Sequence, residues 1–131
     1  MKLVIINYGA GNIQSIKFAF ERLGVHAILS DDADEIKAAD KVIFPGVGEA
    51  SSAMAKLKAT GLDKVIPTLK QPVLGICLGM QLLLDESDEQ SRTEGLGFIK
   101  GKVRRIPDNI NNPVPHVGWD NVIVEKEEVL L

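Results

Sequence analysis

The sequence is poor in the residues that cross-link or metallate small proteins. Its 131 residues include one cysteine, Cys77, and two histidines, His26 and His116. A lone cysteine cannot form an internal disulfide, and two distant histidines do not make a zinc-ligand pattern, so neither metal nor cofactor is expected. No apolar run approaches the roughly 20 residues that span a bilayer, and no signal peptide follows Met1. We therefore expect a cytoplasmic protein without membrane contact.

The sequence also lacks an excess of positive charge. Its formal net charge is −3, and Lys and Arg are scattered among Asp and Glu. The electrostatic footprint of a nucleic-acid binder is therefore missing, whereas small polar substrates remain open. With 45% hydrophobic residues, the length suits one domain with its own core. We expect residues 1–131 to form a single domain.

Short β-branched runs alternate with helical segments along the first two thirds of the chain. Strands are predicted at residues 2–7, 27–29, 41–44 and 72–76, and helical segments at residues 12–23, 34–39, 49–60, 62–69 and 78–85. Strands separated by helices favour a parallel sheet that is covered on both faces. The predicted fold class is therefore α/β.

The pattern changes after Asp85. An acidic segment (85–94) precedes an Asn- and Pro-rich loop (107–115) and an alternating run (121–125), which predict a small antiparallel or irregular addition. The chain stops at an apolar tail, without the strand and helix that would cover the last face of the sheet. We expect an incomplete domain whose sheet is partly uncovered because C-terminal elements are missing.

Residues 75–79 (GICLG) have the form of a nucleophile elbow, a sharp turn between a strand and a helix. Glycines two before and two after Cys77 let the turn pack tightly, while Cys77 takes a strained conformation that presents its sulfur. The positive end of the following helix favours a thiolate there. The alternative is that Cys77 is a small buried hydrophobe of the core.

A second glycine loop, residues 45–48 (PGVG), also follows a strand and so belongs at the same carboxyl edge of the sheet. Its glycines free the backbone to direct an N–H at a developing oxyanion, which complements the N–H of Leu78. The alternative is an ordinary turn before the next helix.

Two further motifs carry weaker signals. Residues 8–12 (YGAGN) fail the dinucleotide fingerprint because Gln14 occupies the third glycine position, so they predict a turn with Asn12 as helix cap and as a contact residue. His116 and Trp119 lie in the loop PHVGW. An interface role is favoured for both over a role of His116 as base for Cys77.

Together these motifs, NYGAGN (7–12), PGVG (45–48), GICLGMQ (75–81) and PHVGW (115–119), resemble the glutaminase subunit of imidazole glycerol phosphate synthase. This family of class I (triad) glutamine amidotransferases has a flavodoxin-like fold, and the resemblance covers the whole chain. It implies hydrolysis of glutamine to glutamate and ammonia through a cysteine thioester. It also implies passage of the ammonia to a (β/α)₈-barrel cyclase in histidine biosynthesis.

The resemblance assigns roles to individual residues. Cys77 is the nucleophile. The oxyanion region comprises Gly46, Val47, Gly48 and Leu78; the glutamine-binding residues are Gly79, Gln81 and Glu89; the residues toward the cyclase are Asn12, His116 and Trp119. One departure matters: the family's catalytic histidine and glutamate belong to a His-Pro-Glu segment, which this sequence does not contain. The 131-residue chain is therefore expected to be inactive alone.

Two alternatives remain open at this stage. One is a triad amidotransferase of another pathway, against which the NYGAGN start and the PHVGW loop speak. The other is a non-catalytic flavodoxin-like binding module whose cysteine belongs to the core. The solvent exposure of Cys77 and its reaction with an electrophilic glutamine analogue distinguish the last of these from an enzyme.

Overall fold

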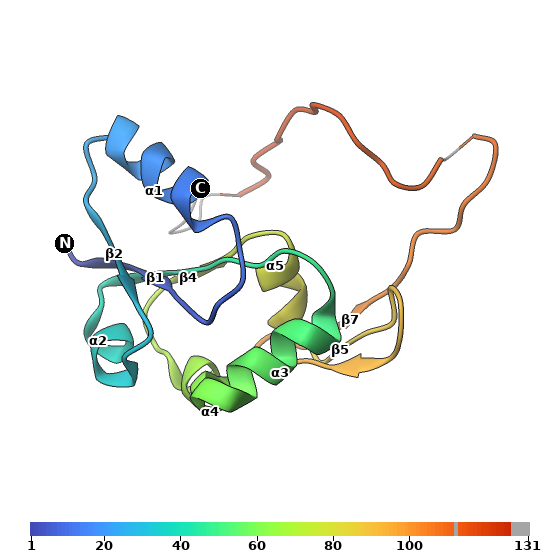
Figure 1. Cartoon of the computed structure of the whole chain (residues 1–131). Helices are drawn as coiled ribbons and strands as arrows, with labels where there is room; N and C mark the ends of the chain where they lie inside the picture. Colours follow the sequence, from blue (N-terminus) through green and yellow to red (C-terminus); the bar gives the residue numbers. More distant parts are fainter. Residues whose placement is uncertain (112, 127–131) are drawn as a thin grey trace.

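A four-stranded parallel sheet forms the centre of the chain, seen in a computed structural model that describes residues 1–111 and 113–126 (Figure 1). Its strands are β1 (Leu3–Ile6), β2 (Ala27–Ser30), β3 (Lys41–Phe44) and β4 (Val73–Gly75), in the order β2-β1-β3-β4. Every neighbouring pair is parallel. The predicted strands and their parallel arrangement are confirmed.

Helices cover both faces of this sheet, as predicted. They are α1 (Ile13–Arg22), α2 (Ala33–Ala38), α3 (Ala50–Thr60), α4 (Leu62–Val65) with a 3₁₀ turn (Ile66–Thr68), and α5 (Leu78–Leu82). Helix α1 lies on one face, and α2, α3, α4 and α5 lie on the other (Figure 1).

Alternate residues of the strands face the two helical layers. Val4 and Phe44 belong to the large cluster under α2–α5, while Ile5 and Ile43 belong to the smaller cluster under α1. Because both faces are buried, the strands read as continuous apolar runs. The face toward α1 is less completely covered at β4, where Leu74 is 40% exposed. Within the described residues, no helix combines the length and apolar character that crossing a bilayer requires.

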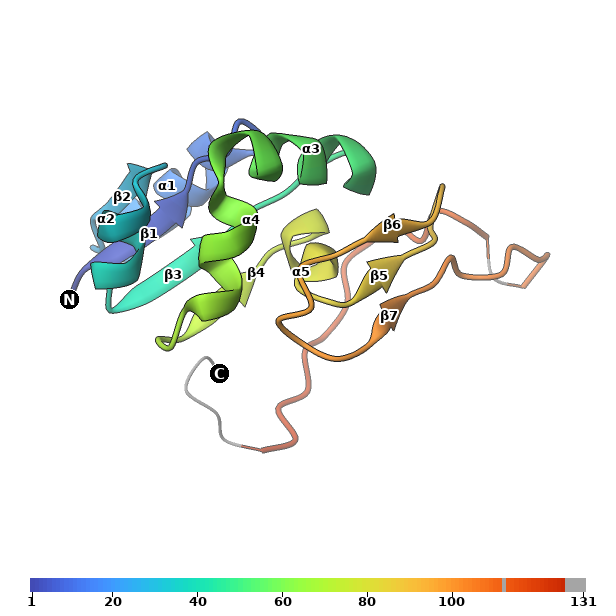
Figure 2. The same ribbon diagram turned by 90° about the horizontal axis from the view of Figure 1, so that it is seen from below.

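A second, three-stranded sheet follows α5. It consists of β5 (Glu86–Ser87), β6 (Thr93–Glu94) and β7 (Lys102–Val103), in the order β6-β5-β7 (Figure 2). Strand β5 pairs antiparallel with β6 but parallel with β7. The predicted antiparallel addition is therefore wrong in this respect. The sheet is mixed because β7 lies on the side of β5 opposite to β6 and runs in the same direction as β5.

Helix α5 is shorter than predicted and ends at Leu82 instead of Asp85. The backbone carbonyls of Leu82 and Leu84 accept hydrogen bonds from the N–H groups of Leu96 (2.8 Å) and Gly97 (3.1 Å). These bonds from a distant segment satisfy carbonyls at and just after the end of the helix, so further helical turns are not needed.

The run 121–125, for which an antiparallel or irregular structure is predicted, forms no strand and is exposed. It is therefore irregular.

Candidate active site

Cys77 lies at the sharp turn between β4 and α5. Its φ of 55° and ψ of −120° place it among the rarely populated backbone conformations. In the described part of the chain it is the one non-glycine residue with positive φ. Such strain concentrates at functional sites. The Cys77 side chain is exposed, so the alternative of a buried core cysteine is wrong.

The two glycines of the elbow are required by close backbone contacts. A Cβ on Gly75 would lie 2.6 Å from Met80 Cα, and a Cβ on Gly79 would lie 2.0 Å from the carbonyl oxygen of Phe44. Both distances are far below van der Waals contact. Any side chain at either position would force the strand and helix apart, so the GxCxG spacing follows from the packing of this turn.

The loop 45–48 meets the elbow at the carboxyl edge of the sheet. Strands β3 and β4 are neighbours, and the N–H of Ile76 donates to the carbonyl of Phe44 (3.0 Å). A Cβ on Gly46 would lie 2.5 Å from the backbone nitrogen of Gly79. The backbones of the two glycine loops therefore touch, and both Val47 and Gly48 are exposed beside them.

A cleft opens between the end of the 45–48 loop and the second sheet. It is small and is lined by Gly48, Glu49, Ala50, Ser87, Glu89, Gln90, Ser91 and Thr93. The cleft brings Gly48 and Glu89 together, although Cys77 is not among its lining residues in the described chain. Sequence reasoning missed the hydroxyls of Ser87, Ser91 and Thr93, whose only signal was their place around the acidic run.

Gln81 carries an unsatisfied polar group. Within the described residues, its buried Oε1 atom has no hydrogen-bond partner, although buried acceptors are nearly always paired. Gln81 lies on α5, one turn beyond Cys77. Across residues 1–111 and 113–126, no three His, Cys, Asp or Glu side chains are grouped so as to hold a metal ion.

Asn12, His116 and Trp119 lie on exposed segments. Asn12 occupies the N-cap position of α1, as predicted, but its side chain makes no capping hydrogen bond. Trp119 is completely exposed, and His116 is exposed in the same extended segment. The chain after β7 loops out beyond the second sheet and then returns toward the main sheet (Figure 1). Among residues 1–111 and 113–126, no hydrogen bond ties the His116 side chain into a site.

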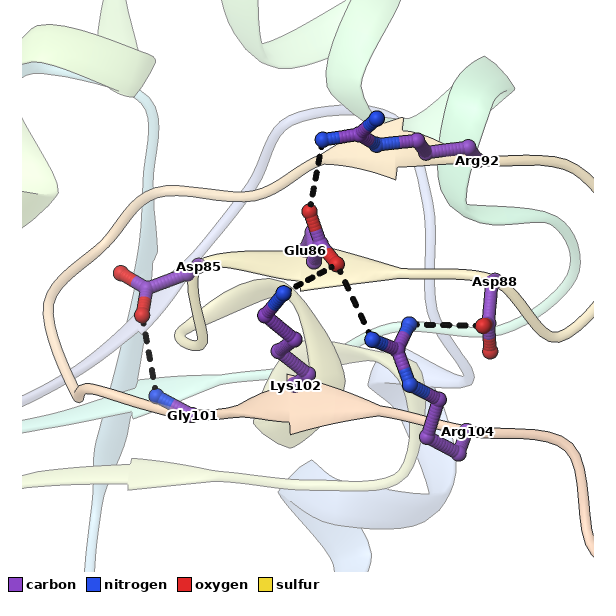
Figure 3. A network of polar contacts seen from close by, with 7 residues as sticks. All are labelled: Asp85, Glu86, Asp88, Arg92, Gly101, Lys102 and Arg104. Carbon is purple, nitrogen blue, oxygen red and sulfur yellow. Dashed lines mark hydrogen bonds and ion pairs between the residues drawn. The ribbon is translucent and has the colours of Figure 1, made fainter.

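An ion-pair network stabilises the second sheet (Figure 3). Glu86, on the central strand β5, pairs with Arg92 (3.2 Å), Lys102 (3.1 Å) and Arg104 (3.3 Å). Arg104 also pairs with Asp88 (2.6 Å). The Glu86 side chain is only 15% exposed, whereas its three cationic partners are 52–82% exposed, so water still screens each pair in part. The network connects all three strands around the segment that carries Glu89.

The cations around Glu86 change its ionisation. The hydrogen bond from Lys102, helped by the charges of Lys102 and Arg92, holds the pKa of the Glu86 carboxyl below its ordinary value of 4.5. Burial of the carboxyl opposes this effect without reversing it. Glu86 is therefore ionised at neutral pH, where it attracts all three cations.

The parallel sheet, with an exposed and strained cysteine at a glycine-flanked elbow on its carboxyl edge, defines an α/β protein with a candidate nucleophile. The family model for class-I glutamine amidotransferases matches residues 4–130. The chain belongs to the class-I glutamine amidotransferase family.

Its relatives narrow this class. The chain is 48% identical over 130 residues to "Imidazole glycerol phosphate synthase subunit HisH" of Bacteroides fragilis, covering 98% of this chain and 66% of the relative. It is 48% identical to the protein of the same name from Pasteurella multocida, covering 92% of this chain and 60% of the relative. The chain thus spans less than two thirds of the length of these curated relatives, and the predicted resemblance to this subunit is confirmed.

A solved structure supports the fold. The chain matches a "Crystal structure of glutamine amidotransferase" with a TM-score of 0.65 and 22% identity, covering 78% of this chain and 56% of that chain. At this level of identity the match shows the fold alone. It agrees with the parallel sheet and its helices.

We predict that Gly79→Ala destabilises the chain by about 3 kcal/mol, because the added methyl group would overlap the carbonyl of Phe44. Gly61→Ala is the matched control. Unlike Gly79, Gly61 has a positive φ (74°), but nothing lies within 4 Å of an added Cβ, so only the backbone cost of about 1 kcal/mol applies. Urea unfolding measures both. Equal losses in the two variants would contradict the close packing of the elbow.

The Glu86 network predicts a pH-dependent stability difference between the parent chain and Glu86→Gln. A carboxyl whose pKa is lowered on folding stabilises the folded state above the unfolded value, and this contribution disappears as pH falls through the folded value. The parent should therefore be more stable than Glu86→Gln at neutral pH, and the difference should vanish as pH falls below 4.5. High salt should also reduce it.

Urea unfolding at a series of pH values tests this, with Glu94→Gln as control because Glu94 is exposed on neighbouring β6. A difference between Glu86→Gln and the parent that stays constant with pH would show that the carboxylate charge is unimportant.

Proposed function

We propose that the chain is the cysteine-bearing part of a glutaminase, which releases ammonia from glutamine for imidazole glycerol phosphate synthesis in histidine biosynthesis. The observation that carries this proposal is the exposed, strained Cys77 whose elbow packs against the glycine loop 45–48. The 48% identity to synthase subunits supports the pathway.

In this proposal the Cys77 thiolate attacks the side-chain amide carbon of glutamine. The carbonyl oxygen becomes an oxyanion, which accepts hydrogen bonds from the backbone around Gly46, Val47 and Gly48 and from the N–H of Leu78. The C–N bond then breaks as the nitrogen takes a proton from water, and ammonia leaves. The hydroxide formed in this way attacks the thioester and yields glutamate and the free thiol. The covalent intermediate divides one difficult hydrolysis into two easier steps.

The cleft beside Gly48 is the proposed site for the amino-acid end of glutamine. The Glu89 carboxylate can pair with the α-ammonium group, and the neighbouring serine hydroxyls offer hydrogen bonds to the α-carboxylate. Gly79 and Gln81 complete the glutamine site from α5. The buried Oε1 atom of Gln81, which lacks a partner among the described residues, is suited to accept a hydrogen bond from the substrate or from a partner group.

The proposed partner is a (β/α)₈-barrel cyclase that receives the ammonia. The name of the relatives, a synthase subunit, supports an assembly of this kind. Trp119 is completely exposed, and aromatic side chains are enriched at protein interfaces. Val117, in the same loop, is also 85% exposed. Asn12, His116 and Trp119 are therefore the residues proposed to face the cyclase.

We predict that the chloroketone analogue of glutamine, in which a chloromethyl group replaces the amide nitrogen, labels Cys77 selectively. The thiolate displaces chloride and forms a stable thioether, which mass spectrometry detects. Labelling should saturate with the analogue and should slow when glutamine is added, because both compete for one site. Cys77→Ser should remain unlabelled. Labelling that is equally fast with the D-enantiomer and insensitive to glutamine would refute the substrate site.

We further predict that the 131-residue chain alone turns over glutamine about 10²- to 10⁴-fold more slowly than a full-length relative, the cost of a missing general acid–base. The reason is that residues 1–131 contain no His-Pro-Glu segment to protonate the leaving nitrogen. Ammonia release is measured for both proteins with and without the cyclase. Comparable rates would show that another group in this chain supplies the proton.

A further inference from the structure

Tyr8 makes an interaction that the proposed chemistry does not explain. It follows β1, is 3% exposed, and donates a hydrogen bond of 2.8 Å from its hydroxyl to the carbonyl oxygen of Pro45. Its ring packs against Phe44, with centroids 5.5 Å apart and planes tilted by 52°. A buried hydroxyl from one loop thus fixes the first carbonyl of the loop 45–48.

The same two loops are in contact at a second point. Gly11 has a φ of 110°, and a Cβ added to it would lie 2.9 Å from Pro45 Cβ. The loop is also tied to α3, where Lys56 Nζ donates to the carbonyl of Gly9 (3.0 Å). The loop between β1 and α1 therefore forms a fixed wall against which residues 45–48 pack.

The contacts continue from this wall to the nucleophile. A Cβ on Gly46 would lie 2.9 Å from the Tyr8 hydroxyl oxygen and 2.5 Å from the Gly79 nitrogen. Gly46 therefore lies in close contact with both the tyrosine and the elbow that carries Cys77. Among the described residues, the Tyr8 hydroxyl makes the one side-chain hydrogen bond to the peptide groups of residues 45–48, so their orientation depends on it.

We propose that Tyr8 is a positioning residue, whose hydroxyl fixes the Pro45 peptide and thereby the direction of the backbone amides that face the oxyanion. This inference rests on the glutaminase function proposed above. The loop that contains Tyr8 also contains Asn12, one of the residues proposed to face the cyclase. A shift of that loop on partner binding would reach residues 45–48 through this hydrogen bond.

The hydroxyl is suited to a permanent contact of this kind. Burial raises the pKa of Tyr8 to about 12, so the phenol remains a neutral donor throughout the range in which enzymes are assayed. Removal of the hydroxyl leaves the Pro45 carbonyl without this donor in a buried place, which favours a rotation of the peptide toward another partner.

The test uses Tyr8→Phe in the 131-residue chain, with the chloroketone analogue of glutamine as the probe of Cys77. The labelling rate at saturation should fall about tenfold, less than the 10²–10³ that loss of an oxyanion donor costs, because the amides are misdirected but still present. The half-saturating concentration should stay within about twofold, because the cleft at Glu89 is untouched. Alkylation by iodoacetamide, which needs no oxyanion contact, should keep its parental rate.

Thr60→Val is the matched control, since it removes a partly buried hydroxyl that donates to the carbonyl of Leu57 (3.0 Å), far along α3. It should leave all three values unchanged. Gly11→Ala is an independent variant that pushes on Pro45 from the other side, and Gly24→Ala is its control, because Gly24 has a φ of 71° but no atom within 4 Å of an added Cβ. Gly11→Ala should slow labelling at saturation, whereas Gly24→Ala should not.

The outcomes separate the two proposals. If the parent chain is not labelled selectively, the glutaminase function fails. If the parent is labelled and both Tyr8→Phe and Gly11→Ala keep its saturating rate, the role of Tyr8 is refuted. A parallel fall in iodoacetamide reactivity would also refute it, because a general disturbance of Cys77 would then explain the result. Circular dichroism at the assay temperature confirms that each variant is folded.

Discussion

Two backbones lie closer together at the elbow than any pair of side-chain-bearing residues would permit. Residues 44–46 and residues 78–79 touch through Gly46 and Gly79, where an added Cβ would come within 2.5 and 2.0 Å of main-chain atoms. This contact sets how β3 and α5 join and where Cys77 is presented. A methyl group at Gly79 would separate Cys77 from the loop proposed to stabilise the oxyanion, so the packing and the proposed chemistry depend on the same two glycines.

The strain at Cys77 is maintained by the core around it. A non-glycine residue in a sparsely populated conformation costs of order 1–3 kcal/mol and persists only when its surroundings determine it. Here the surroundings are rigid, because Leu78 and Leu82 of α5 are almost fully buried in the same cluster as Phe44. The buried leucines hold the turn in place, while Cys77 itself remains exposed. This arrangement places the free thiol of Cys77 at the surface of a well-packed sheet.

The second sheet stabilises its part of the proposed site through charge. Its strands are two residues long and bury little apolar surface, so the ion pairs around Glu86 connect them in place of a core (Figure 3). The cleft that contains Glu89 lies between this polar unit and the apolar main sheet. One wall of the cleft is therefore fixed by packing, and the other is sensitive to pH and salt.

The sequence by itself determined the central sheet, the helices on both faces, the elbow at Cys77 and the family, because each rests on local periodicity or on glycine spacing. It did not determine the end of α5, the parallel pairing of β7 or the contact between Tyr8 and Pro45. These depend on residues that are far apart in the chain: hydrogen bonds from Leu96 and Gly97 end the helix, and 37 positions separate the tyrosine from its acceptor. Only the tertiary structure brings such groups within hydrogen-bonding distance.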